Sequence, residues 1–214
     1  KFAKKEEPSI SSHLDLMHAM HVRWHAARSP LWFTEGFNQH AYVSVALPLS
    51  TGYSGECEFL DFNITQKPCR KMRWKRSMMY FPRACVQSKI YPLADGGMKV
   101  GSIEWSQYRI TWGFEMDAKG FADDVRNLFR RPMVEIVKRS KRGEKTVNMR
   151  ELMRDLTVTD GLMVTAVVTT AAGNNNMSPE YLTRAIRQYL PQYEIPFSAY
   201  HRMNVFTSDG TPFR

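Results

Sequence analysis

A regular pattern of apolar residues predicts a helix near the N-terminus. Between residues 12 and 28, one helical stripe comprises His13, Leu16, Met17, Met20, Trp24 and Ala27. Ser12 followed three residues later by Asp15 is typical of a helix N-cap. Pro30 ends the helix, because the residue before a proline avoids the α region. We expect this stripe to face a hydrophobic core.

Segments on both sides of this helix predict strands. Apolar, β-branched or alternating residues occur near Phe2 and over residues 42–49, 56–64 and 86–91. A second helix is expected over residues 68–79. The resulting order in the first half is strand, helix, strand, strand, helix, strand.

The second half follows the same plan. Strands are expected over residues 103–115, 133–138, 162–170 and 199–206, helices over 118–130 and 178–190, and a short helix over 147–156. The βαββαβ order is that of ferredoxin-like folds, in which two helices cover one face of an antiparallel sheet. We therefore predict an α+β protein with two ferredoxin-like halves, residues 1–95 and 104–214, packed into one body. The Gly-containing segment 94–101 is the expected linker.

Composition adds a basic charge to this picture. The 214 residues include 30 Lys and Arg against 21 Asp and Glu, for a formal net charge of +9. Such a charge attracts polyanions, among them RNA, DNA and anionic membranes. A basic surface that is merely solvated explains the same charge. The location of the cations therefore has to decide between the two interpretations.

Two segments concentrate the basic residues. Residues 67–76 contain no acidic residue, and Arg70 and Arg73 are candidate phosphate ligands there. The second segment surrounds the tip of an expected hairpin, and its candidate ligands are Lys138, Arg139, Lys141 and Arg142. A neighbouring strand carries aromatic residues that stack bases if they lie on an open face, whereas core packing is the alternative. These are Trp105, Tyr108 and Trp112.

The cysteines and the lengths of the apolar runs exclude several classes of protein. The spacing of Cys57, Cys69 and Cys85 matches neither a zinc knuckle nor an iron-sulfur motif. An odd number of cysteines without a framework pattern fits a reducing compartment, so we expect a cytoplasmic protein. No apolar run approaches the roughly 20 residues that cross a bilayer, and no membrane partner is expected.

Histidine and carboxylate residues gather near the first helix. His18, His21 and His25 share a helical face that carries no carboxylate or cysteine, so we expect a solvated face and no bound metal. A second group forms a candidate binding pocket. It consists of His13, Asp15, Glu35, Gly36, Phe37, Asn38 and His40. Two imidazoles and two carboxylates suffice for proton transfer or for hydrogen bonding to a base, but helix capping and turn formation explain the same residues.

Several of these segments together resemble the bacterial radical SAM-linked protein family. The segments are 12–17, 35–38, 46–49 and 58–61 in the first half, and 134–152, 172–174, 179–180 and 201–202 in the second. The order and spacing of the first block are kept over about fifty residues, a length at which chance matches become improbable. The resemblance covers nearly the whole chain.

The resemblance implies an accessory role. Members are fused to, or encoded beside, a radical SAM enzyme, and often near genes for ribonuclease G-type and ribosomal proteins. We therefore expect an RNA-binding or substrate-presenting partner of such an enzyme, acting in tRNA or rRNA modification. The iron-sulfur cluster and S-adenosylmethionine would belong to the partner, with no cofactor and no known catalytic residue in this chain. Two alternatives remain: a stand-alone acid-base enzyme using His13, Asp15, Glu35 and His40, and a pure protein-interaction module.

Overall fold

The computed structural model shows a mixed α+β fold, as expected. It describes residues 1–4, 13–26, 31–37, 39–65, 85–87, 89, 98–115, 118–140, 143–160 and 163–213. The chain divides into two compact units, Lys1–Ser102 and Ile103–Arg214. The sequence placed the linker at residues 94–101, of which 98–101 are described.

The first unit is built around a short central strand. Its elements are β1 (Phe2–Lys4), α1 (His13–Ala26), β2 (Val43–Val45), β3 (Ser54–Glu58), β4 (Leu60–Phe62), β5 (Cys85–Gln87) and a 3-10 turn, η1 (Val100–Ser102). Strand β1 lies between β5 and β3 and is antiparallel to both, while β2 pairs with β4. The core includes Leu16, Met20 and Trp24 of α1. The predicted apolar stripe of this helix is thus confirmed for Leu16, Met20 and Trp24, while Met17 is half-buried and Ala27 and the side chain of His13 lie outside the described residues.

The second unit contains a four-stranded antiparallel arrangement. Its elements are β6 (Ile103–Gly113), α3 (Phe121–Arg130), β7 (Glu135–Ser140), β8 (Gly143–Asn148), η2 (Met149–Glu151), β9 (Met153–Thr159), β10 (Met163–Ala171), η3 (Gly173–Asn175), α4 (Glu180–Tyr189) and β11 (Phe197–Thr207). Within this unit the strand order is β11, β6, β10, β9, and neighbouring strands are antiparallel. Among the described strands, β7 and β8 pair with each other alone, as a hairpin.

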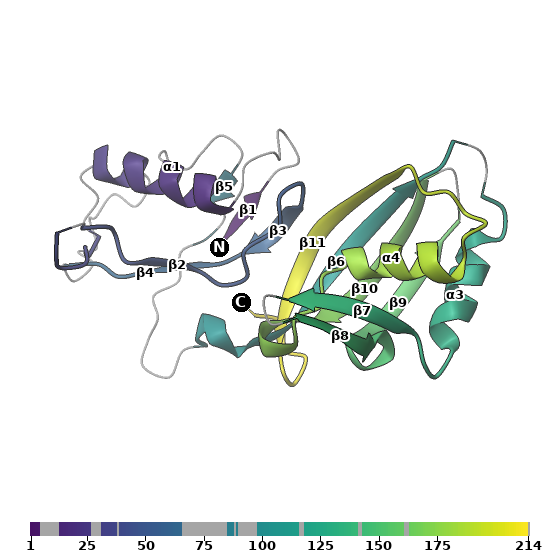
Figure 1. The fold of residues 1–214 in the computed structure, drawn as a ribbon. Coiled ribbons are helices and arrows are strands. Elements are labelled where there is room, and N and C mark those ends of the chain that lie inside the picture. Colours follow the sequence, from purple (N-terminus) through teal and green to yellow (C-terminus); the bar gives the residue numbers. More distant parts are fainter. Residues whose placement is uncertain are drawn as a thin grey trace. The chain divides into compact units, whose positions relative to one another are not determined.

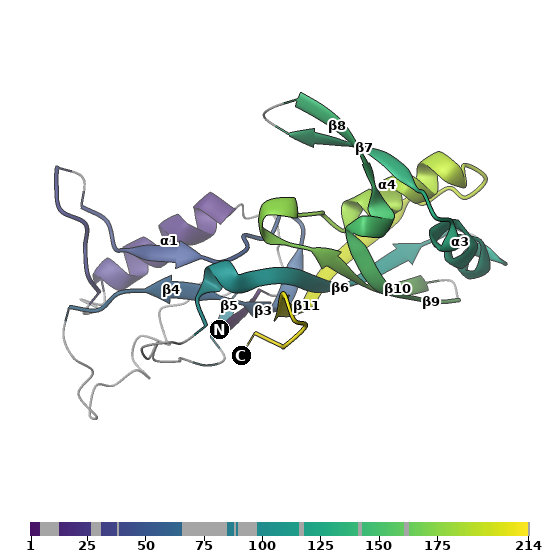
Figure 2. The ribbon, with the colours of Figure 1, turned by 90° about the horizontal axis from the view of Figure 1, so that it is seen from below.

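Both helices of this unit cover the same face of the four strands (Figures 1 and 2). Trp112 of β6 contacts each of them, since its indole Nε1 donates to Thr183 Oγ1 of α4 and its ring meets the Phe121 ring of α3. The residues on this face are buried at alternating positions of β6, among them Tyr108 and Ile110, as the two-residue period of a strand requires. None of the described helices of this unit lies on the opposite face, which we call the open face.

One sequence-based expectation is wrong in the second unit. Residues 147–156 were expected to form a short helix, but they end β8, form the 3-10 turn η2 and begin β9. Short apolar runs fit a helix and a strand equally well. Here pairing with β10 selects the strand, because it buries Met153 and Val158.

Two further expectations are not settled by the described residues. The helix expected over residues 68–79 lies outside them, and so do Arg70 and Arg73. The arrangement of two ferredoxin-like halves therefore stays a prediction.

Candidate nucleic-acid interface

The open face of the second unit carries polar and aromatic side chains in ordered rows. Across β11, β6 and β10, the register aligns Phe206 with Trp105 and Ala171, Asn204 with Gln107 and Thr169, and His201 with Arg109 and Val167. On β6 these positions alternate with the ones buried under the helices, so their side chains project away from α3 and α4. None of the open-face positions in these described registers is Asp or Glu. The register positions of this face therefore carry cations and no carboxylate, while the exposed Asp155 lies in the bulge of β9 beside Arg154.

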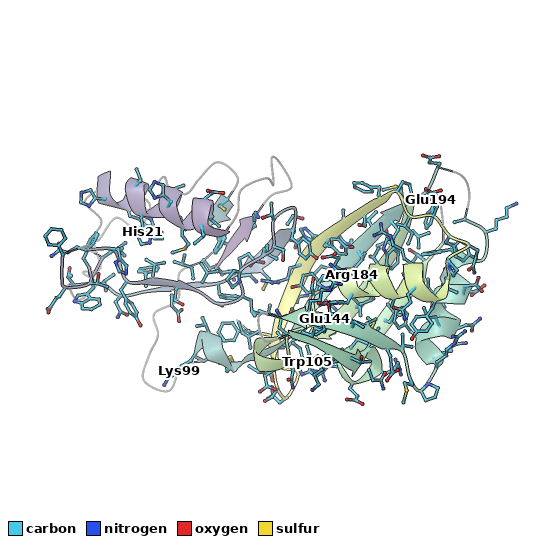
Figure 3. All side chains as sticks on the ribbon, viewed as in Figure 1. His21, Lys99, Trp105, Glu144, Arg184 and Glu194 are labelled. Carbon is cyan, nitrogen blue, oxygen red and sulfur yellow. The ribbon has the colours of Figure 1, made fainter. Side chains whose placement is uncertain are left out.

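A stacked pair lies at one end of this face. The guanidinium carbon of Arg154 is 3.5 Å from the centroid of the Trp105 ring, which is a close cation-π contact. Arg154 belongs to β9 and Trp105 to β6, with β10 between them. Thr169 of β10, which pairs with Arg154, is only 4% exposed although it lies on the open face. The arginine therefore extends across β10 to reach the ring of Trp105, which Figure 3 labels.

A bulge in β9 accompanies this arrangement. The pairing of β9 with β10 shifts between Val167 and Thr169, and Asp155, the residue after Arg154, has a φ of 56°. Asp tolerates this left-handed region better than most residues. Bulges bend a strand and redirect neighbouring side chains, often beside functional sites.

Amide and cationic side chains fill the middle of the open face. Asn204 Nδ2 donates a hydrogen bond to Gln107 Oε1 at 3.0 Å. In the next row Arg109 is exposed and His201 half-buried. Side chains of these types contact base edges and phosphates in nucleic-acid complexes.

Apolar side chains occupy the other end of the open face. Phe197 and Met163 are 52% and 54% exposed and pair with Gly113 of β6 from either side. A Cβ on Gly113 would lie 3.3 Å from Met163 Sδ and 3.4 Å from Phe197 Cδ1, so the absent side chain lets the two residues approach. Gly113 and Trp105 are eight residues apart on one strand, which corresponds to about 26 Å. The face is long enough for several nucleotides.

The basic hairpin is formed, but two of its described cations, Lys138 and Arg139, have partners within the chain. Arg139 Nε lies 2.7 Å from Glu144 Oε1, and Lys138 Nζ donates to the carbonyl oxygen of Asn176. Lys145 is exposed and lies directly opposite Lys138 in the register. Like charges at opposed positions destabilise a strand pair, and a bound anion would reduce the repulsion between these two lysines. Lys141 and Arg142 lie outside the described residues.

Two tyrosines attach the hairpin to α4. The Tyr189 hydroxyl accepts from the backbone N–H of Glu135 at 3.2 Å and donates to its carbonyl oxygen at 3.0 Å. The Tyr181 hydroxyl accepts from the N–H of Arg139 at 3.3 Å. These bonds satisfy edge groups of β7 that would otherwise face water. The hairpin therefore lies on the helical side of the unit, away from the open face (Figure 2).

The candidate pocket of the first unit is only partly described. His13 begins α1, Asp15 is exposed in its first turn, and Glu35 and Phe37 are exposed in the following loop, where Gly36 has a φ of 120°. Asn38 and the side chain of His13 lie outside the described residues.

His40 lies beside the middle of α1. Its ring centroid is 6.4 Å from that of His21, and its Nδ1 is 3.2 Å from Thr34 Oγ1. His21 is eight residues beyond His13, about 12 Å along the helix axis. The described contacts thus join His40 to His21, a pairing that the sequence analysis did not propose.

Burial affects the ionisation of His21. Desolvation lowers the pKa of His21 below its ordinary value, and the neighbouring His40 and His18 lower it further. The neutral form of His21 is therefore favoured. Within the described ranges, no three His, Cys, Asp or Glu side chains gather closely enough to hold a metal ion. In the same part of the chain, no helix is long and apolar enough to cross a membrane.

Comparison with known proteins gives a family and a distant structural likeness. A family model described as an uncharacterized protein conserved in bacteria (DUF2344) matches residues 1–179. No curated protein matches the chain. Among solved structures, a chain from the crystal structure of a Cbf5-Nop10-Gar1 complex is similar, with a TM-score of 0.49 and 10% sequence identity. The likeness covers 95% of this chain and 48% of that chain, so this protein spans about half the length of its structural neighbour.

Proposed function

The chain belongs to the DUF2344 family of bacterial proteins, and from its geometry we propose that it binds single-stranded RNA. In this proposal the RNA lies on the open face of the second unit. The protein then acts as an accessory that presents tRNA or rRNA to a radical SAM enzyme.

The stacked pair Arg154 and Trp105 carries this proposal. Unpaired bases stack on aromatic rings and on guanidinium planes, and open antiparallel sheets serve as platforms for such stacking. The Arg154 plane over Trp105, at 3.5 Å, offers such a surface. A base paired in a duplex cannot lay its face on this surface. Single-stranded RNA is therefore favoured over duplex.

The charge of the open face supports the same ligand. Arg109 and Arg154 lie on a face whose described registers contain no carboxylate. Such cations attract the phosphate backbone, and this attraction weakens with added salt. In the proposal, the remaining candidates Arg70, Arg73, Lys138, Arg139, Lys141 and Arg142 extend the phosphate contacts beyond the open face.

The strand order of the second unit also supports a ferredoxin-like half. In chain order its main elements are β6, α3, β9, β10, α4 and β11, with the β7–β8 hairpin as an insertion. This is the βαββαβ order with both helices on one face. We extend the same fold to the first unit.

The radical SAM partner rests on the family resemblance seen in the sequence. The chain would contribute RNA binding, while the partner would contribute the cluster and S-adenosylmethionine. The loop around Phe37, the most exposed large apolar residue in the described chain, together with His13, Asp15 and Asn38, is the proposed contact for that enzyme or for a base. The expected site of action is the cytoplasm.

A binding experiment tests the RNA part of the proposal. Fluorescence anisotropy with a labelled single-stranded RNA of about twelve nucleotides, and with its duplex, should show tighter binding of the single strand. Trp105→Ala and Arg154→Ala should each weaken binding by about fivefold or more, given ~1–3 kcal/mol per stacked base. Arg184→Ala is the matched control, because Arg184 lies on α4, away from the open face (Figure 3).

The outcomes separate the alternatives. Unchanged affinity of both open-face variants would refute the site. Co-purification of the chain from its native cell tests the partner. A radical SAM enzyme recovered without RNA would indicate a protein-interaction module, and recovery of neither would defeat the proposal.

A further inference from the structure

We propose that the amide pair formed by Gln107 and Asn204 makes the open face selective for adenine. This inference rests on the proposed function, since it assigns a base preference to the same RNA site.

The hydrogen bond between the two amides leaves an acceptor on one of them and a donor on the other. Asn204 Nδ2 donates to Gln107 Oε1 at 3.0 Å, and the two residues are register partners on β11 and β6. The bond uses one N–H and one oxygen lone pair. Asn204 Oδ1 then remains as an acceptor and Gln107 Nε2 as a donor. The mutual bond holds both amides in place, which lowers the entropy lost when a base binds.

Adenine matches this surface on both of its edges. Its N6 amino group donates beside the acceptor N7 on one edge and beside the acceptor N1 on the other, and a bidentate amide pairs with such an edge. The corresponding N7 edge of guanine offers only acceptors, O6 and N7. On their Watson–Crick edges the other bases also present a donor beside an acceptor: N1–H beside O6 in guanine, N4–H beside N3 in cytosine and N3–H beside O4 in uracil. On the major-groove edge, adenine alone presents such a pair, N6–H beside N7, so the amide pair selects adenine through this N7 edge.

The position of the pair beside the stacked arginine adds to this preference. Gln107 is two residues from Trp105 along β6, about 7 Å, and its row also contains Thr169 and Arg154. A base lying on the Arg154 plane thus directs an edge toward the amide row. A purine covers more of the guanidinium and ring surface than a pyrimidine does. Stacking and edge contacts consequently favour the same base.

Homopolymeric RNA tests the preference directly. Anisotropy titrations with single-stranded oligo(A), oligo(C) and oligo(U) of equal length should show oligo(A) binding about tenfold more tightly, as expected for one bidentate contact. Asn204→Ala and Gln107→Glu should reduce this ratio toward one, because each removes a donor or acceptor from the pair. Gln188→Ala is the control, since Gln188 is an exposed amide on α4 and should leave the ratio unchanged.

The failures of the two proposals are distinguishable. Equal binding of the three oligonucleotides would overturn the adenine preference while leaving RNA binding intact. A preference for oligo(A) that survives both substitutions would overturn the role of the amide pair. Absence of binding to all three at low salt would overturn the proposed function itself.

Discussion

Trp112 and Thr183 are joined by a buried hydrogen bond between the sheet and α4. Trp112 Nε1 donates to Thr183 Oγ1 at 2.9 Å, and the Tyr200 hydroxyl donates to the same oxygen at 2.9 Å. Trp112 and Thr183 are almost fully buried. A single hydroxyl oxygen thus satisfies two donors under the helix, and it fixes α4 on the covered face of the sheet.

Replacing this threonine should destabilise the second unit. Thr183→Val keeps the volume but removes the acceptor, so the indole N–H is left buried without its partner, at a cost of about 1–3 kcal/mol. Urea unfolding should show a lower midpoint with an unchanged slope. Thr157→Val, at an exposed position of β9, is the control and should change stability by less than about 0.5 kcal/mol. Equal midpoints for Thr183→Val and the wild type would contradict the assigned role of this bond.

Removing one open-face cation should alter the salt dependence of RNA binding. Arg109 is exposed and pairs in register with His201 and Val167. Arg109→Ala should lower the slope of log affinity against log salt by about 0.7, the value for one phosphate contact with a single strand. The measurement is anisotropy over a series of salt concentrations. An Arg109→Ala slope equal to that of the wild type would show that Arg109 meets no phosphate.

Tyr193 should make stability depend on alkaline pH. Its hydroxyl donates to Asp124 Oδ2 at 2.7 Å. Burial first, then this bond and the charges of Asp124 and Asp160, raise the pKa of Tyr193 to about 12. The folded state therefore holds this proton more tightly than the unfolded state, where the pKa of tyrosine is about 10. The stabilisation is fully present below that value and is lost as the pH rises through 12.

Comparison with Tyr193→Phe isolates this contribution. The free energy of unfolding of the wild type should fall relative to that of the variant as the pH rises from 10 to 12, because phenylalanine has no proton to lose. Denaturant titrations at several pH values measure the difference. A constant difference across the range would show that the hydroxyl is not held as described.

Cys85 should resist alkylation in the folded protein. The thiol is 6% exposed, and burial raises its pKa to about 11, with the nearby Lys4 opposing the rise and Glu58 adding to it. Since the thiolate is the nucleophile, almost none is present at neutral pH. Iodoacetamide should therefore modify Cys85 far more slowly in the native chain than in urea, as followed by mass spectrometry. Similar rates in both states would contradict this environment.

Several features follow from the sequence alone. The stripe Leu16, Met20 and Trp24 predicted both a helix and its buried face, because side chains three and four residues apart lie on one side of a helix. The long β-branched or aromatic segments that became β6 and β10 predicted strands for a similar reason. The alternation within β6 also required Trp105 to face away from Tyr108 and Trp112. The net charge and the basic hairpin segment were likewise evident.

Tertiary structure decided which of those aromatic residues remained accessible. Alternation separates Trp105 from Trp112, but only the packing of α3 and α4 determines which face is covered. Packing of this kind depends on contacts between residues distant in sequence, which a local pattern does not encode. The same limit applies to Arg154, which meets Trp105 across β10 from 49 positions away, and to His40, which meets His21. Local periodicity therefore determined the elements, and long-range packing assembled the candidate site.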